Sequence, residues 1–289
     1  MTSTPATRQL DLLAGYRLSG ETSVEVGTRT LVAPAGAKGA AFFDVDNTIM
    51  RGSSLFHMAM GLMRHRYFRM HDMAGFAVKQ VKFVMSGSED LEDMQSAITA
   101  GLSFVAGRPV DELVALGEQI FDESMVDTLI PGSLALAQAH LDAGDEVWLI
   151  TATPIELAAL IASRLGLTGA LGTVAEVHDG IYTGRLVGPP LHGVAKAEAV
   201  RALAAHEGID LRACAAYSDS VNDIPMLSTV GRPVAVNPDS ALRAHARANG
   251  WPIHDFRRRE HVKRYALPAA AAVTGAVVGY AMGRLSRRR

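Results

Sequence analysis

Four short apolar runs, each followed by a polar residue, constrain the fold of this chain more than any other feature. The runs span 40–43, 146–150, 213–217 and 233–236 and lead into Asp44, Thr151, Ser218-Asp219 and Asn237. Helical patterns lie between them, at 132–143, 154–165 and 194–206. Short buried strands that alternate with helices are typical of a parallel sheet covered on both faces. We therefore predict an α/β fold whose polar residues collect at the carboxyl ends of the strands.

A segment of about eighty residues after the first strand breaks this alternation. Residues 53–130 contain four helical patterns and no strand pattern, at Leu55–Phe68, Met73–Met85, Leu91–Phe104 and Val110–Thr128. We interpret this segment as a helical cap, either a lid over the site or a structural subdomain, inserted into a core of 39–52 and 131–256. Within the core, Gly172–Val187 predicts a β-hairpin with Asp179-Gly180 as its turn.

Composition excludes several classes of protein. The 289 residues carry 28 Lys and Arg against 30 Asp and Glu, and this near balance argues against a dedicated nucleic-acid binder. The single cysteine, Cys214, excludes a disulfide scaffold and a multi-cysteine metal site, and we expect it to be buried. Residues 1–38 lack the apolar run of a signal peptide, so we predict a flexible leader and a catalytic body in the cytoplasm.

The end of the chain has a different composition. After Phe256 there are nine basic residues and one acidic residue, Glu260, and the basic residues flank an uncharged segment, Ala266–Gly283. A helix of that length would span about 27 Å, close to the thickness of a bilayer core. We predict for 257–289 a basic linker and an apolar helix that docks on or spans an anionic membrane. The alternatives are an Ala/Gly tail that packs on the domain or that has no fixed structure.

Carboxylates gather at two of the predicted strand ends. Asp44 and Asp46 follow the first strand two residues apart, so a turning chain can direct both into one pocket. Asp219 and Asp223 follow the third strand. An aspartate can act as a nucleophile, and a second carboxylate can transfer protons. Like charges held this close require a cation, and oxygen ligands favour Mg²⁺.

Two further residues complete the arrangement. The hydroxyl of Thr151 could donate a hydrogen bond to a phosphoryl oxygen, and the ammonium of Lys196 could offset its charge. Taken alone, a D-x-D pair is most often a turn or a helix cap, and a single lysine is most often a surface residue. The order Asp-x-Asp-x-Thr, strand-Thr, Lys and Asp-x-x-x-Asp, each at a strand end, is far more specific.

This arrangement resembles that of the haloacid dehalogenase superfamily of phosphohydrolases, in the branch related to phosphoserine phosphatase. The resemblance covers about 39–256 and implies a Rossmann-like core and a helical cap. It also implies an enzyme in which Asp44 attacks phosphorus and Asp46 protonates the leaving alcohol and later activates water. It further implies a Mg²⁺ ion held by Asp44, the Asp46 carbonyl and Asp219, with Asp223 beside them. The implied substrate-binding residues are Thr151, Ala152, Lys196 and Asn222.

The substrate remains open between several small or surface-bound phosphomonoesters. Phosphoserine phosphatases carry a glutamate nine residues after the nucleophile, where this chain has Ser53. A neutral hydroxyl cannot replace a carboxylate that faces an ammonium group. Because the predicted cap carries cations and methionines, a lipid phosphate at a membrane surface is one alternative. A phosphotransferase and a membrane-associated regulatory protein with an inactive enzyme fold are the others.

Overall fold

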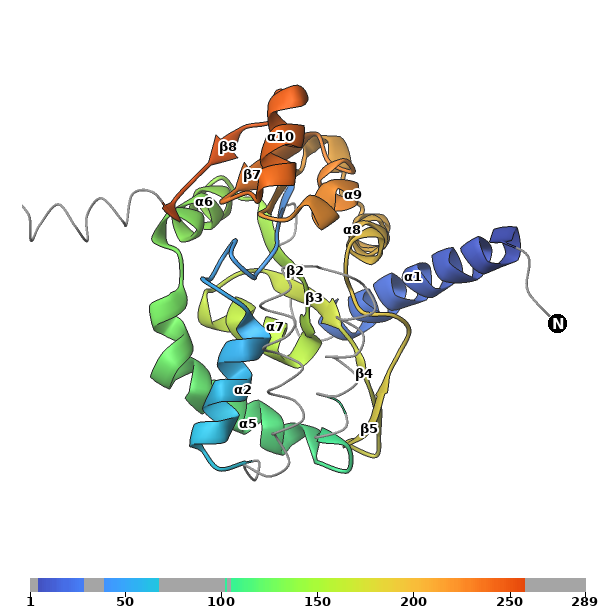
Figure 1. Cartoon of the computed structure of the whole chain (residues 1–289), viewed down its shortest axis with the longest axis vertical. Coiled ribbons are helices and arrows are strands. Elements are labelled where there is room, and N and C mark those ends of the chain that lie inside the picture. Colours follow the sequence, from blue (N-terminus) through green and yellow to red (C-terminus); the bar gives the residue numbers. More distant parts are fainter. Residues whose placement is uncertain (1–4, 29–38, 68–101, 103–104, 258–289) are drawn as a thin grey trace, which may run out of the picture.

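The computed structural model describes residues 5–28, 39–67, 102 and 105–257. Its centre is a six-stranded sheet in which each strand runs parallel to its neighbour, in the order β3-β2-β1-β6-β7-β8 (Figure 1). The strands are β1 Ala40–Phe43, β2 Glu146–Pro154, β3 Gly169–Thr173, β6 Ala215–Ser218, β7 Arg232–Val236 and β8 Ile253–His254. Because β1 pairs with both β2 and β6, the carboxyl ends of these three strands are neighbours. The predicted α/β fold with a parallel sheet is confirmed.

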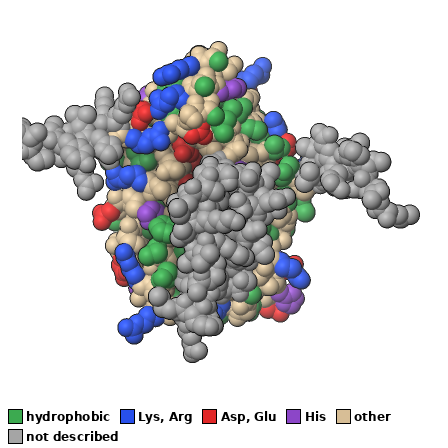
Figure 2. Space-filling view, in the orientation of Figure 1, with side chains coloured by type: hydrophobic (Ala, Val, Ile, Leu, Met, Phe, Trp, Pro, Cys, Tyr) green, Lys and Arg blue, Asp and Glu red, His purple; other side chains and the backbone are tan. Residues whose placement is uncertain are grey.

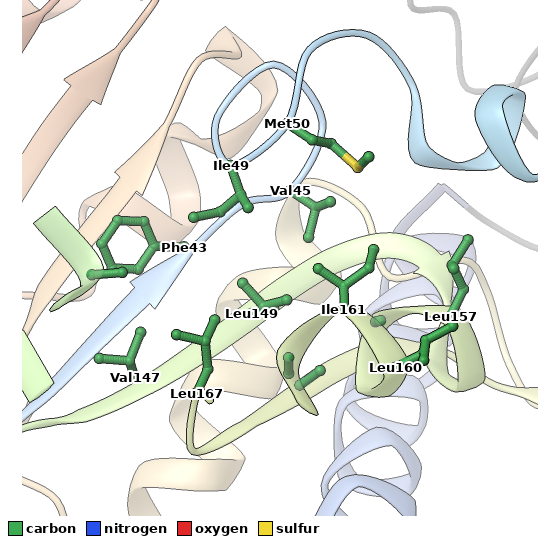
Figure 3. Packing of buried hydrophobic residues seen from close by; sticks show 14 of the residues in the cluster. Phe43, Val45, Ile49, Met50, Val147, Leu149, Leu157, Leu160, Ile161 and Leu167 are labelled. Carbon is green, nitrogen blue, oxygen red and sulfur yellow. The ribbon is translucent and has the colours of Figure 1, made fainter. Parts of the chain in front are cut away.

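Helices cover both faces of the sheet. On one face lie α6 Pro131–Asp142 and α7 Ile155–Arg164, and on the other lie α8 Val194–Glu207, α9 Ile224–Leu227 and α10 Ser240–Ala248. Successive residues of a strand point to opposite faces. Phe43 accordingly belongs to one buried cluster and Phe42 to the other. Figure 3 shows Phe43 packed near Leu149 and Val147 of the neighbouring strand.

The two strands that the sequence pattern missed are short or poor in β-branched residues. β3 has the sequence Gly-Ala-Leu-Gly-Thr, and β8 has two residues. The hairpin is confirmed in β4 Ala175–His178 and β5 Ile181–Leu186, which pair antiparallel. Asp179 and Gly180 both have positive φ, 50° and 76°, as a tight hairpin turn requires.

The structure corrects the prediction of a flexible leader over 1–38. Residues 5–28 form α1 Pro5–Thr28, whose second half packs on α8 and β3, while 1–4 and 29–38 lie outside the described residues. Small residues recur every four positions on its contact surface: Gly15, Ser19, Ser23 and Gly27 lie against Pro189, Gly172 and Ala170. Val24 of the same helix is buried in the core. The Ser23 hydroxyl is 2.9 Å from both the carbonyl oxygen and the amide nitrogen of Gly172 in β3. Close approach of backbones and side-chain hydrogen bonds hold this helix, rather than a long apolar stripe.

The insert after β1 is helical where the structure describes it. It contains α2 Ser54–Arg64 and α5 Val110–Ile120, followed by a π-helical turn, Phe121–Met125, and a 3-10 turn, Val126–Thr128. The β4–β5 hairpin contacts this insert, because Tyr182 N donates to Arg108 O and Val110 N donates to Gly180 O. The helix predicted at Met73–Met85 lies outside the described residues, as does the helix predicted at Leu91–Phe104 except for residue 102.

The face of the molecule shown in Figure 2 carries basic side chains toward its upper end, with acidic side chains among them. None of the helices in the described part of the chain is both long and apolar enough to cross a bilayer. The predicted C-terminal apolar helix, Ala266–Gly283, lies outside the described residues, so membrane association by this segment stays a prediction.

Candidate active site

The loop after β1 presents two aspartates at the carboxyl edge of the sheet. Its backbone turns sharply, because the amides of Thr48, Ile49 and Met50 all donate to the Val45 carbonyl. The side chains of Val45, Ile49 and Met50 are buried and anchor the turn in the core (Figure 3). Asp44 itself begins at the strand end, where its amide donates to the Tyr217 carbonyl of β6 at 2.9 Å.

Lys196 is the centre of a buried group of charges. Its Nζ lies 2.6 Å from Asp44 Oδ1 and 2.7 Å from Asp223 Oδ2. The Lys196, Asp44 and Asp223 side chains are 4%, 7% and 1% exposed, so water screens these charges little. The sequence predicted that Lys196 and the two aspartates act together, and the structure brings them into contact.

The buried carboxylates outnumber the ammonium group. Burial raises the pKa of Asp44 to about 7, and the nearby Lys196 offsets only part of this effect. Burial alone would lower the pKa of Lys196, but Asp223 and Asp44 outweigh it and hold the pKa above its ordinary value. Burial also raises the pKa of Asp46. The site therefore has a negative charge that a further cation or a proton would compensate.

The donor atoms at this site fit Mg²⁺. Among the described residues, Asp223 Oδ1 is buried without a hydrogen-bond partner, which is costly unless something else binds it. The atoms at this site that could bind a metal are carboxylate and carbonyl oxygens, the ligand type that Mg²⁺ prefers. Within the same residues, no group of three or more His, Cys, Asp or Glu side chains is arranged to hold a metal ion. The predicted ligand set includes three such side chains, those of Asp44, Asp219 and Asp223, so the structure does not gather all three around one point. The fourth predicted donor is the main-chain carbonyl of Asp46.

Thr151 lies near the end of β2 and joins a series of buried hydroxyl groups. Its Oγ1 is 3.0 Å from Thr153 Oγ1, which is 2.6 Å from Ser54 Oγ. Ser54 in turn donates to Asp46 Oδ1 from its hydroxyl at 2.6 Å and from its amide at 2.8 Å. The sequence analysis missed Ser54 and Thr153. The signal for Thr153 was its position two residues after Thr151, which places both on one face of the strand.

The loop after β6 carries the remaining predicted residues. Asp219 directly follows the strand, and Asn222 lies in the 3-10 turn Val221–Asp223. Asp239, also missed by the sequence analysis, holds this loop: its carboxylate accepts from Val221 N at 2.8 Å and from Leu242 N at 2.7 Å.

Ala152 and Ser53, the two positions still to be described, both have structural roles. The Ala152 carbonyl accepts a hydrogen bond from Thr173 Oγ1 at 2.7 Å, which ties the second motif to β3. Ser53 is the N-cap of α2, and its side chain accepts from Phe56 N at 3.4 Å. Position 53 is therefore used to begin the helix, where a phosphoserine phosphatase has a glutamate.

Cys214 precedes β6 and is fully buried, as expected. Burial raises the pKa of its thiol. Because it lies at the amino end of β6, away from the carboxyl ends of the strands that carry the site, it is a small core residue.

Lys196 lies in the first turn of α8 and not at a strand end as predicted. An α/β core with aspartates and a threonine at neighbouring strand ends, and a buried helical lysine between two of the aspartates, defines a class of phosphatases. The chain belongs to the haloacid dehalogenase-like hydrolase family, whose model matches residues 41–228. This assignment confirms the resemblance that the motifs predicted, and it identifies the chain as a hydrolase of the phosphatase type.

The chain is also similar to three known proteins. It is 54% identical to "Phosphoserine phosphatase SerB1" of Mycobacterium tuberculosis over 256 residues, which cover 89% of this chain and 82% of that protein. It is 30% identical to a solved protein of unknown function from Bordetella pertussis Tohama I, with a TM-score of 0.67, covering 76% of this chain and 99% of that one. A phospho-aspartyl intermediate analogue of phosphoserine phosphatase shares the fold at 19% identity, with a TM-score of 0.53 and coverage of 79% and 99%.

Proposed function

We propose that this chain is a Mg²⁺-dependent phosphomonoester hydrolase that works through a phosphorylated Asp44. The observation that carries this proposal is the contact of Lys196 with both Asp44 and Asp223 in a buried site. Catalysis of phosphoryl transfer depends mainly on positioning and on compensation of charge, and this group of residues supplies both.

In the first step, a carboxylate oxygen of Asp44 forms a bond to phosphorus, and the bond from phosphorus to the leaving oxygen breaks. Asp46 gives its proton to that oxygen, so the product leaves as an alcohol. The raised pKa of Asp46 favours the protonated form that this step requires. Thr151 and Lys196 bind the phosphoryl oxygens, assisted by Ala152 and Asn222.

In the second step, water attacks the phosphorus of the phosphorylated Asp44. The Asp46 carboxylate takes a proton from this water, and the bond between Asp44 and phosphorus breaks to release inorganic phosphate. Asp44, Asp219, Asp223 and the main-chain carbonyl of Asp46 would hold the metal. When bound, Mg²⁺ supplies the positive charge that neutralises these carboxylates and the phosphoryl oxygens.

Phosphoserine is the first substrate to test, because the 54% identical relative carries the name of a phosphoserine phosphatase. Ser53 argues for a different contact with the substrate ammonium, since this side chain caps α2. We therefore propose a small phosphomonoester as the substrate class, with phosphoserine as its leading member.

The test is release of inorganic phosphate by the full chain in Mg²⁺. The panel contains phosphoserine, sugar phosphates, nucleotides and lysophosphatidate, and Asp44→Asn is the blank. We expect release from at least one small ester, loss of this release in Asp44→Asn, and loss in the wild type after chelation of the metal. Release from lysophosphatidate alone would replace the small ester with a lipid substrate. Absence of any release that depends on Asp44 would overturn the proposed function.

A further inference from the structure

Ser54 holds one oxygen of Asp46 from two directions. Its amide nitrogen lies 2.8 Å from Asp46 Oδ1, and its hydroxyl oxygen lies 2.6 Å from the same atom. Ser54 is fully buried and is the first residue of α2, so these contacts join the start of the insert to the loop after β1. Two donors at hydrogen-bonding distance fix the orientation of a carboxyl group better than one, because rotation of the group about its Cβ–Cγ bond would break both hydrogen bonds.

The core fixes the Ser54 hydroxyl in turn. A hydroxyl has one proton, and Asp46 Oδ1 already accepts from the Ser54 amide, so it is an acceptor both in the ionised carboxylate and in the acid that carries its proton on the other oxygen. Ser54 therefore donates to Asp46 and must accept from Thr153 Oγ1, 2.6 Å away. The Thr153 hydroxyl therefore donates its hydrogen bond to Ser54, and it accepts one from Thr151 Oγ1 at 3.0 Å. The hydrogen bonds run in one direction, from β2 through Ser54 to Asp46.

This direction persists when a phosphoryl group is present. If Thr151 turns its proton toward a phosphoryl oxygen, Thr153 loses a donor but keeps its bond to Ser54. The bond from Ser54 to Asp46 is therefore independent of what Thr151 binds. Ser53, by contrast, is exposed, so its own hydrogen bond to Asp46 competes with water.

We propose that Ser54 is a positioning residue that fixes the Asp46 carboxyl group for proton transfer to the leaving oxygen. The proposal rests on the proposed function, in which Asp46 is the acid. With Oδ1 held by Ser54, the proton is delivered from the other oxygen of the carboxyl group at a defined orientation. If this orientation is wrong, the first step becomes slower for an ester whose leaving oxygen needs a proton, and its rate changes little for an ester whose leaving oxygen does not.

The experiment measures the first step separately for two esters, with full-length protein in Mg²⁺. One ester is an alkyl phosphate, whose alkoxide must be protonated, and the other is p-nitrophenyl phosphate, whose leaving group is weakly basic. For Ser54→Ala, we expect the single-turnover rate of alcohol release to fall on the order of tenfold or more, within the range of general acid catalysis. The burst rate of p-nitrophenolate should fall less than about threefold.

Two further variants control for a general structural defect. Ser54→Thr keeps both donors and should restore most of the rate with the alkyl ester. Ser133→Ala removes another buried serine, whose hydroxyl has no hydrogen-bond partner among the described residues, and should change neither rate. Thermal unfolding of all three variants checks that they are folded at the assay temperature.

The outcomes separate this inference from the proposed function. Equal losses with both esters, or a Ser133→Ala variant as impaired as Ser54→Ala, would overturn the positioning role while Asp44-dependent hydrolysis stands. If wild-type protein shows no Asp44-dependent release from either ester, the proposed function fails, and the role of Ser54 fails with it.

Discussion

Two buried polar networks in this molecule differ in how completely their members are paired. In the first, Lys196 contacts the carboxylates of Asp44 and Asp223, and Asp223 Oδ1 is left without a partner among the described residues. In the second, His140 at the end of α6 lies 2.8 Å from Asp145 Oδ2 and 2.7 Å from the Tyr217 hydroxyl. Both ring nitrogens of this histidine are therefore used.

The difference between the two networks distinguishes a group of residues that binds a ligand from one that stabilises the fold. A fully paired network gains its hydrogen bonds in the folded chain itself and needs no ligand. A network with more carboxylates than cations is costly until an external group compensates the charge, and that cost is recovered when the group binds. We infer that the network at Lys196 exists for a ligand, while the network at His140 joins α6 to β6.

Removal of the Lys196 ammonium group should give the largest effect. In Lys196→Met, two buried carboxylates lose their shared cation, so we expect the free energy of unfolding to fall by about 3–5 kcal/mol. Phosphatase activity should fall by at least about a thousandfold. Urea unfolding and phosphate release measure the two effects. The control is Arg212→Met, whose side chain is 91% exposed and should change neither quantity. A Lys196→Met protein as stable as wild type would contradict this account.

Neutralisation of one carboxylate in the same network should separate activity from stability. Asp44→Asn keeps the shape of the side chain and removes one negative charge from a site that has too many. We expect activity to fall to the background rate, while the free energy of unfolding stays the same or rises. Equilibrium unfolding in urea at neutral pH is the measurement. A loss of more than about 1 kcal/mol would mean that the Asp44–Lys196 pair is a net stabilising contact.

The sheet was predictable because its strands are buried on both faces, and burial leaves short apolar runs in the sequence. β1 and β2 are strands of this type, and the residues at their ends followed from the polar residue after each run. Helix α1 was not predictable by the same reasoning, because it docks through glycines and serines. The four-residue spacing of Gly15, Ser19, Ser23 and Gly27 was its signal, and hydrophobicity did not reveal it.

The candidate site was predictable in its residue types and less so in its contacts. A motif order identified Lys196, but nothing in the sequence states that this lysine lies between Asp44 and Asp223. Ser54 and Thr153 were missed for a related reason. Serine and threonine are common at helix starts and in strands, so a hydrogen bond between residues 99 positions apart leaves no local pattern.

A pH titration sharpens the comparison in metal-free protein. Burial raises the pKa of Asp44 to about 7 in the folded chain, whereas an aspartate in an unfolded chain titrates near pH 4. Between these values the folded chain holds a proton that the unfolded chain has lost. The free energy of unfolding should therefore decrease as pH rises from about 4 to about 7. Urea unfolding across this range measures the slope, and Asp44→Asn should flatten it. The same slope in both proteins would assign it to another group.

The smallest effect should come from the fully paired network. Tyr217→Phe removes one hydroxyl and leaves His140 paired with Asp145, while the ring keeps its stacking on Phe43 at 4.1 Å. The cost should be that of one hydrogen bond, about 0.5–1.5 kcal/mol of unfolding free energy, with phosphate release within about twofold of wild type. The same two assays used for Lys196→Met place both networks on one scale. If Tyr217→Phe reduced activity as strongly as Lys196→Met, the His140 network would be part of the active site, and complete pairing would no longer distinguish structure from function.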